Sequence, residues 1–250
     1  MVKREDIVCF LNTYLHSAEV EDSSLNGLQV QGRDTVRKIV FGVSASLELF
    51  KKAAAAGADM IIVHHGLLWG REQALVGTFG KRVGFLLQHE ISLLGYHLPL
   101  DKHPKIGHNA LLISSLAATN VKPFAAYHGQ EIGFCGRIKP ASLQQVVRSL
   151  EKTCAARATV LPFGPKKIRT VGIVSGGGWS MLPDATALGL DLFVTGSLDE
   201  PAYELCREGK INCIGLGHYN SEKIGVRALM KLVQQHFDVE TQFIEIKNPL

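Results

Sequence analysis

The chain has 250 residues, 46% of them hydrophobic and 20% charged, which is enough apolar material for one large globular domain or two smaller ones. The net charge is +4, and lysine and arginine never run longer than a pair, so a nucleic-acid-binding surface is unsupported. No apolar stretch reaches the roughly 18 residues of a membrane-spanning helix, and the charged N-terminus lacks the apolar core of a signal peptide.

Helices and strands alternate along the first half of the chain. Apolar residues at helical spacing predict an amphipathic helix over 1–15, and a segment rich in turn formers follows at 21–32. Beyond it, the sequence predicts strands over 37–45, 58–66 and 91–100, and helices over 46–57, 79–90 and 106–119. Such alternation is typical of a mostly parallel sheet that is covered by helices.

The second half continues in the same style. It predicts strands over 132–138, 169–178, 190–196, 211–219 and 241–246, and helices over 141–154 and 199–209, with further helices before 190 and after 219. Five cysteines without a C-x-x-C pair indicate reduced thiols, and we expect a cytoplasmic protein.

Three segments recur in the same order in both halves, which indicates an internal duplication. GADMIIVHHG resembles GLDLFVTGSL, ISLLGYHLPLDKHPKIGHNALL resembles INCIGLGHYNSEKIGVRALM, and KIVFGVS resembles RTVGIVS. Chance likeness between α/β units is the alternative, but three matches in one order favour duplication. We therefore expect two α/β repeats, residues 1–125 with the HHG and HLPLD motifs and residues 126–250 with the GHYNSE motif.

Histidine and carboxylate side chains gather where the predicted strands end, and ligands of open α/β sheets bind at such ends. These side chains are His64, His65, His97, Asp101, His218 and Glu222. Imidazole and carboxylate together suit Zn, Fe, Mn, Co or Ni, and the absence of a cysteine cluster argues against structural zinc. A single catalytic zinc takes three protein ligands. Two acids and three imidazoles from this set, five ligands in all, fit two metal ions better, with one carboxylate bridging them.

The doublet of His64 and His65 needs a local explanation, because neighbouring residues on a strand point to opposite faces. We expect the HHG segment to turn beyond the last ladder bond, with Gly66 adopting backbone angles that a side chain would forbid. Each histidine could then address one metal ion. A hydrogen-bonded structural role is the alternative for any single histidine at a strand end.

Other signals are weaker. The segment SGGGWS at 175–180 could hold a phosphate, but it lacks the P-loop lysine, and a tight turn is the favoured interpretation. The remaining candidates are expected on the surface or in local capping: His89, His103, His108, His128 and His236. No G-x-S-x-G motif and no cysteine nucleophile signature occurs, which argues against covalent acyl chemistry.

Five motifs in order resemble those of the NIF-three-like family, also called GTP cyclohydrolase 1 type 2 homologs. They are SLNGLQVQG, GADMIIVHHGLLW, YHLPLDKHPKIGHNALL, FVTGS and GHYNSEKIGVRAL, and they cover nearly the whole chain. The resemblance implies two intertwined, duplicated α/β repeats with mostly parallel mixed sheets. It also implies a dinuclear site for divalent metal ions and a toroidal homohexamer.

The resemblance further implies the roles of individual residues. The metal ligands would be His64, His65, Asp101, His218 and Glu222, with Glu222 bridging. His97 would lie beside the metal ions as a catalytic residue that moves a proton. Many members of the family have TGE where this chain has Thr195, Gly196 and Ser197, so a carboxylate that often borders the cleft is missing.

Two functions remain open. The first is a metal-dependent hydrolase acting on a small molecule, with a nucleotide such as GTP as the candidate substrate. The second is a metal-bearing scaffold or metal-handling protein that catalyses nothing. A simple assay distinguishes the two functions: it asks whether the purified protein releases product from nucleotides only when metal is bound.

Overall fold

The computed structural model describes residues 1–248, and the chain divides into two compact units. The first consists of Met1–Leu100 together with Val226–Lys247, and the second is built on Asp101–Gly225. Within residues 1–248, no helix has both the length and the apolar character needed to cross a membrane. The predicted repeats are defined by sequence likeness rather than by contacts, so their limits at 1–125 and 126–250 stay a prediction.

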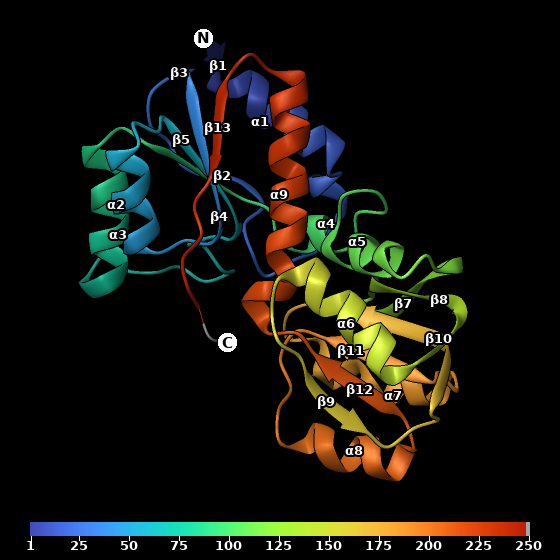
Figure 1. The fold of residues 1–250 in the computed structure, drawn as a ribbon. Helices are drawn as coiled ribbons and strands as arrows, with labels where there is room; N and C mark the ends of the chain where they lie inside the picture. Colours follow the sequence, from blue (N-terminus) through green and yellow to red (C-terminus); the bar gives the residue numbers. More distant parts are fainter. Residues whose placement is uncertain (249–250) are drawn as a thin grey trace. The chain divides into compact units, whose positions relative to one another are not determined.

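The first unit contains a five-stranded sheet in the order β13-β4-β5-β6-β2 (Figure 1). Its strands are β2 (Gly27–Val30), β4 (Lys38–Ser44), β5 (Met60–His65), β6 (Ser92–Gly95) and β13 (Glu240–Phe243). All neighbours are parallel except β2, which runs antiparallel to β6. A separate two-stranded sheet pairs β1 (Val2–Lys3) with β3 (Thr35–Val36).

Helices cover this sheet. They are α1 (Arg4–Tyr14), the 3-10 helix η1 (Ser17–Glu19), α2 (Leu47–Ala55), α3 (Gly77–Gln88) and the later part of α9 (His218–His236), which begins in the second unit. Helix α2 begins where Ser46 Oγ accepts the N–H of Leu49 at 3.2 Å, and Gly57 follows its end at a φ of +76°. Its buried residues pack with Leu86 of α3 against apolar side chains of the sheet.

The second unit contains a six-stranded sheet in the order β7-β8-β10-β11-β12-β9. Its strands are β7 (Thr119–Tyr127), β8 (Gln130–Ser142), β9 (Thr159–Pro162), β10 (Lys167–Val174), β11 (Leu192–Thr195) and β12 (Asn212–Gly215). The central strands β10, β11 and β12 are parallel, while β7, β8 and β9 pair antiparallel with their neighbours.

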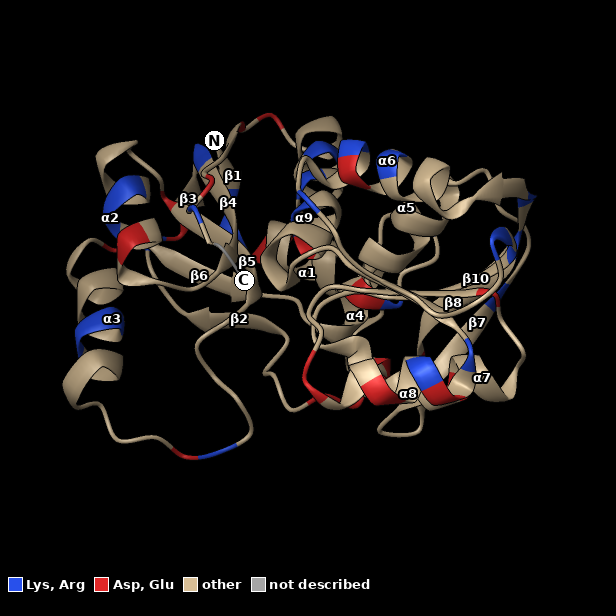
Figure 2. Cartoon of the chain, turned by 60° about the horizontal axis from the view of Figure 1, so that its bottom comes forward, with Lys and Arg blue, Asp and Glu red and all other residues tan. Residues whose placement is uncertain are grey.

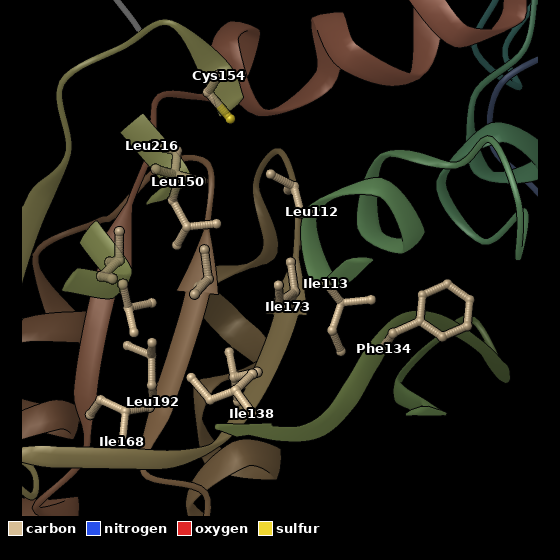
Figure 3. Close-up of a cluster of buried hydrophobic side chains, with 14 of the residues drawn as sticks. Leu112, Ile113, Phe134, Ile138, Leu150, Cys154, Ile168, Ile173, Leu192 and Leu216 are labelled. Atoms are coloured by element: carbon tan, nitrogen blue, oxygen red, sulfur yellow. The ribbon is translucent and has the colours of Figure 1, made fainter. Parts of the chain in front are cut away.

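The core of the second unit lies between its sheet and two helices. The helical segments are α4 (Leu98–Asp101), α5 (His108–Ser115), α6 (Leu143–Cys154), η2 (Gly178–Met181), α7 (Leu182–Ala187) and α8 (Pro201–Gly209). Leu112 of α5 and Leu150 of α6 pack against Ile173 and Leu192 of the strands (Figure 3). A capping box between Ser142 and Gln145 fixes the start of α6. Helix α8 carries both acidic and basic residues (Figure 2).

Matching details in the two sheets support the predicted duplication. Each sheet has a parallel triplet, β4-β5-β6 or β10-β11-β12, with an antiparallel strand beyond its last member. Asp59 accepts the N–H groups of Arg37 and Lys38 at the start of β4. Asp191 likewise accepts the N–H groups of two successive residues within β10, Arg169 and Thr170. A shared sequence pattern thus produces the same aspartate-to-backbone hydrogen bonds between strand segments in both sheets.

The mixed α/β fold that the sequence predicts is confirmed, with differences in detail. The strand expected over 91–100 ends at Gly95, and residues 98–101 form the helical turn α4. The strand expected over 211–219 ends at Gly215, and α9 begins at His218. The strands β1, β2, β3, β7 and β9 were not predicted. Because β7 and β9 are antiparallel edge strands whose residues are mostly exposed or partly buried, they lack the continuous apolar runs that mark the buried parallel strands.

Candidate metal centre

The histidine doublet lies at the end of the buried strand β5, as its sequence predicts. The turn expected in HHG does not come between the two histidines, because His65 still pairs with Ser44 in the ladder and its carbonyl accepts the N–H of Ala45 at 2.8 Å. The two rings nevertheless lie close, with their centroids 4.5 Å apart and their planes tilted by 48°. His64 is fully buried and His65 is partly buried.

Gly66 is required for a different reason from the one expected. It is not among the residues with positive φ, but a Cβ at this position would overlap the side-chain amide of Gln29. Gln29 Oε1 accepts the N–H groups of Leu67 at 2.6 Å and Leu68 at 3.3 Å. The missing side chain therefore lets Gln29 fix the loop that follows the doublet.

The Nδ1 atom of each histidine of the doublet has a partner that orients the ring. His64 Nδ1 lies 2.9 Å from the carbonyl of Tyr96, and His65 Nδ1 lies 3.0 Å from Ser44 Oγ. Because a carbonyl only accepts, His64 carries its hydrogen on Nδ1, so that its lone pair lies on Nε2. Orientation through the second ring nitrogen is typical of metal-binding histidines.

His97 is held by a carboxylate that the sequence did not single out. Its Nδ1 lies 3.0 Å from Oδ1 of Asp22, whose side chain is only 1% exposed. Burial alone would raise the pKa of Asp22, but the hydrogen bond and the charge of His97, together with Asn26, lower it from 3.8 to about 2. Asp22 is therefore ionised at neutral pH and keeps a proton on His97 Nδ1.

These three histidines form one cluster in the first unit. One ring nitrogen from each of His64, His65 and His97 can be chosen so that all lie within 4.8 Å of one another. Such a group could hold a metal ion. His97, expected beside the metal ions, is thus as close to the doublet as a ligand would be.

The second unit contains another pair of side chains that could bind a metal ion, at the start of α9. His218 and Glu222 are four residues apart and therefore lie on one face of the helix. His218 Nε2 is 3.4 Å from Glu222 Oε1, and the glutamate side chain is only 4% exposed. A carboxylate buried this deeply beside an imidazole is costly unless a cation or hydrogen bonds compensate it.

The glycine loop of SGGGWS packs against this pair. Gly176 has a φ of +61°, and a Cβ there would overlap Glu222 Oε1 and lie 3.2 Å from His218 Nε2. Its N–H donates to Ser221 Oγ at 3.0 Å, and its carbonyl accepts the N–H of Ser197 at 2.8 Å. The loop is thus a tight turn that closes over the Glu222 carboxylate, and Ser197 helps to fix it.

Asp101 ends the helical turn α4 and is buried. Its Oδ1 accepts a hydrogen bond from Ser175 Oγ at 3.2 Å. Asn109, which is fully buried, donates to the carbonyl of Ile132 at 2.8 Å and accepts the N–H of Ser175 at 2.6 Å. Neither Ser175 nor Asn109 was singled out as a site residue, because their only sequence signal is a position next to a recognised motif.

Two other histidines were expected on the surface or in local caps, and the structure confirms this for only one of the two. His103 Nδ1 accepts the N–H groups of Lys105 and Ile106, both at 3.2 Å, so the expected local capping is confirmed. His108 was expected on the surface or in a cap, but it is fully buried, and its Nδ1 accepts the N–H of Gly225 at 3.2 Å. The His108 ring fits because Gly225, which lies 117 residues further along the chain, has no Cβ.

The fold and these side chains define a class, an α/β protein of two mixed sheets with histidine and carboxylate groups that could hold metal ions. The family model described as Duf34/NIF3 (NGG1p interacting factor 3) matches residues 2–249. The chain therefore belongs to the DUF34/NIF3 family, as its motifs predict.

Curated relatives agree over their full lengths. A protein of Archaeoglobus fulgidus named GTP cyclohydrolase 1 type 2 homolog is 41% identical over 245 residues, which cover 98% of each chain. An Escherichia coli protein with the same name is 35% identical over 260 aligned positions, covering 99% of this chain and 100% of that one.

Solved structures show the same fold. TTHA1606 from Thermus thermophilus is 34% identical, with a TM-score of 0.91 and complete coverage of both chains. Reduced HcgD from Methanocaldococcus jannaschii is 23% identical, with a TM-score of 0.88 over 98% of both chains, and this likeness shows the fold alone.

Proposed function

We propose that the protein is a hydrolase that depends on two divalent transition metal ions per chain, Zn, Fe, Mn, Co or Ni. The proposed ligands are His64, His65, Asp101, His218 and Glu222, with Glu222 bridging. The observation that carries the proposal is the cluster of His64, His65 and His97, whose ring nitrogens lie within 4.8 Å of one another at the end of β5.

The donor atoms and their surroundings fit such metal ions. Imidazole nitrogen and carboxylate oxygen suit borderline divalent ions, and the partners at His64 Nδ1 and His65 Nδ1 would orient both rings for binding through Nε2. The buried Glu222 carboxylate supplies negative charge where a cation would compensate it. When bound, metal ions of this kind lower the pKa of water toward neutrality and polarise the bond under attack.

The residues of the chain would handle the proton. The ionised Asp22 holds the hydrogen on His97 Nδ1, so that Nε2 of the neutral ring can accept a proton and later return it. The same division of roles between carboxylate and imidazole occurs in hydrolases of unrelated fold. His97 is therefore the proposed catalytic acid and base, and Asp22 is a positioning residue.

The names of the relatives suggest the substrate class. Hydrolysis at the imidazole-ring carbon of a purine nucleotide such as GTP is the reaction that a GTP cyclohydrolase name implies. A panel of purine nucleotides that differ in their phosphates would show which part of the substrate is recognised. We further infer a homohexamer, on family resemblance, and a cytoplasmic location stays a prediction from the cysteine pattern.

The test combines elemental analysis with hydrolysis assays on this nucleotide panel. We expect close to two metal ions per chain in the wild type, most of them lost in His65→Ala and Glu222→Ala, together with all turnover. His89→Ala serves as the control, because His89 is exposed and bonds only locally to the carbonyl of Phe85 at 2.8 Å. A wild type without metal after reconstitution would refute the site.

The hydrolysis assay also separates the two candidate functions. A metal-loaded wild type that converts none of the nucleotides would favour the metal-bearing scaffold instead of the hydrolase. Turnover that persists unchanged in His65→Ala would exclude the proposed ligands from the reaction.

A further inference from the structure

Trp69 is exposed to solvent and yet held in place. The residue is 38% exposed, three positions beyond the HHG motif. Its backbone forms an isolated antiparallel bridge with Ser24, and its indole Nε1–H donates to the carbonyl of Gly66 at 3.0 Å. A large aromatic side chain that is fixed in this way offers a rigid surface at little cost in conformational entropy.

The fixed indole lies beside the histidine cluster. Its ring centroid is 5.0 Å from that of His97, with an angle of 71° between the planes, and 6.2 Å from that of His65. The edge-to-face contact with His97 occupies one part of the indole. Leu25, which is 50% exposed, lies on the adjoining segment, where its N–H donates to the carbonyl of Leu68 at 2.9 Å.

An apolar surface next to a few oriented polar groups is typical of small-molecule sites. Here the apolar part is supplied by Trp69 and Leu25, and the polar part by the imidazoles of His65 and His97. Two partly exposed side chains make a small-molecule ligand a better match than a protein partner, which requires on the order of 800 Å² on each side. An indole face favours a flat π-system, because stacking keeps the whole area of both rings in contact.

We propose that Trp69 determines substrate specificity by stacking on a planar heteroaromatic ring, such as a nucleobase, beside the histidine cluster. This inference rests on the proposed function and adds the part of the substrate that is recognised. Leu25 would border the ring, while the imidazoles face the atoms that react. Phosphate groups are left outside the contact, so the ring rather than the charge would dominate binding at Trp69.

The experiment measures binding of GMP and of ribose 5-phosphate, which has the same phosphate and sugar but no nucleobase. Calorimetry gives affinities, and fluorescence quenching is followed in a Trp179→Phe background, where Trp69 is the remaining tryptophan. We expect GMP to quench the fluorescence and ribose 5-phosphate to leave it unchanged. Trp69→Leu should lower the affinity for GMP about 10- to 100-fold, whereas Trp69→Phe retains most of it.

Two controls keep the result specific. Tyr203→Ala removes an aromatic residue of similar exposure from α8 and should bind GMP as the wild type does. Metal content should stay unchanged in Trp69→Leu, because Trp69 is not a ligand. A loss of binding with full metal content then identifies a ring contact rather than a damaged metal site.

The stacking proposal and the proposed hydrolase can fail separately. Equal binding of GMP and ribose 5-phosphate by the wild type, or undiminished GMP binding by Trp69→Leu, would overturn the stacking proposal. Quenching by GMP without hydrolysis of any nucleotide would leave the ring contact intact and overturn the hydrolase.

Discussion

Replacing Asp22 with asparagine removes the charge that faces His97 while changing the size of the side chain very little. Asp22 accepts hydrogen bonds from His97 Nδ1 at 3.0 Å, from the N–H of Ser24 at 3.0 Å and from the N–H of Leu98 at 2.9 Å. Asparagine keeps one oxygen for the backbone donors, but its amide group cannot accept from the imidazole. We therefore expect His97 to lose its orientation and its preferred tautomer.

The lowered pKa of Asp22 sets the magnitude of the change in stability. A folded-state pKa of about 2 against an ordinary 3.8 corresponds to at most about 2.5 kcal/mol, since one pKa unit is worth about 1.4 kcal/mol. Because the pKa is lowered on folding, this stability is present above pH 3.8 and is lost as the pH falls toward 2. Asp22→Asn should thus lower the melting temperature at pH 7 by about 4–8 °C, and by less near pH 2.

Three measurements check this prediction. Thermal unfolding gives stability at each pH, elemental analysis should show unchanged metal content, and turnover should fall about 10²- to 10⁴-fold if His97 moves the proton. Glu19→Gln is the matched control, because His16 and Glu19 form a pair of the same 3.0 Å length with both side chains exposed. Full activity in Asp22→Asn, or an equal loss of stability in Glu19→Gln, would refute the reasoning.

Three further predictions concern the second unit and the assembly. Gly176→Ala should lose metal and stability, because the new Cβ would overlap Glu222 Oε1 and because the backbone φ of +61° disfavours a side chain. Gly177→Ala should retain both. Equal metal contents in the two variants would contradict the close packing at Gly176. Leu150→Ala should lower the free energy of unfolding, measured in guanidinium, by about 2–5 kcal/mol, whereas Leu188→Ala at an exposed position should change it little. A loss below about 1 kcal/mol in Leu150→Ala would contradict the prediction and show that the core collapses around the cavity. Light scattering should give the mass of a hexamer, and a monomer mass at micromolar concentration would refute that inference.

Periodicity and turn residues were sufficient to predict most of the fold. The parallel strands are continuous apolar runs, so β5 could be placed to within a residue or two, together with the histidines at its end. The strand predicted over 91–100 was extended too far, because residues 98–100 are apolar enough for a strand. A hydrogen bond from the N–H of Leu98 to Asp22, 76 positions away, helps to fix the helical turn instead.

Some residues of the candidate site could likewise be predicted from local sequence, whereas others depend on contacts with distant parts of the chain. His64, His65 and Glu222 were accessible from motifs, because their residue types and spacing are local features of the sequence. Asp22 lies in a turn-rich segment and acquires its role only by meeting His97, 75 positions further on. The burial of His108 likewise depends on the missing side chain of Gly225. Contacts of this kind are made by tertiary packing, and a single sequence carries no periodic signal for them.

The pairing of β13 with β4 has a consequence for the order in which the molecule can form during synthesis. Glu240 lies opposite Lys38 in this parallel pair, and their side chains form an ion pair at 2.6 Å. About 200 residues separate the two strands along the chain, so β4 leaves the ribosome long before the strand that covers its edge. An uncovered edge invites pairing with other chains, which makes the nascent N-terminal sheet the aggregation-prone part. The strands of the second unit all lie within the continuous stretch Asp101–Gly225, so its sheet has no such wait. The N-terminal sheet is made first and completed last.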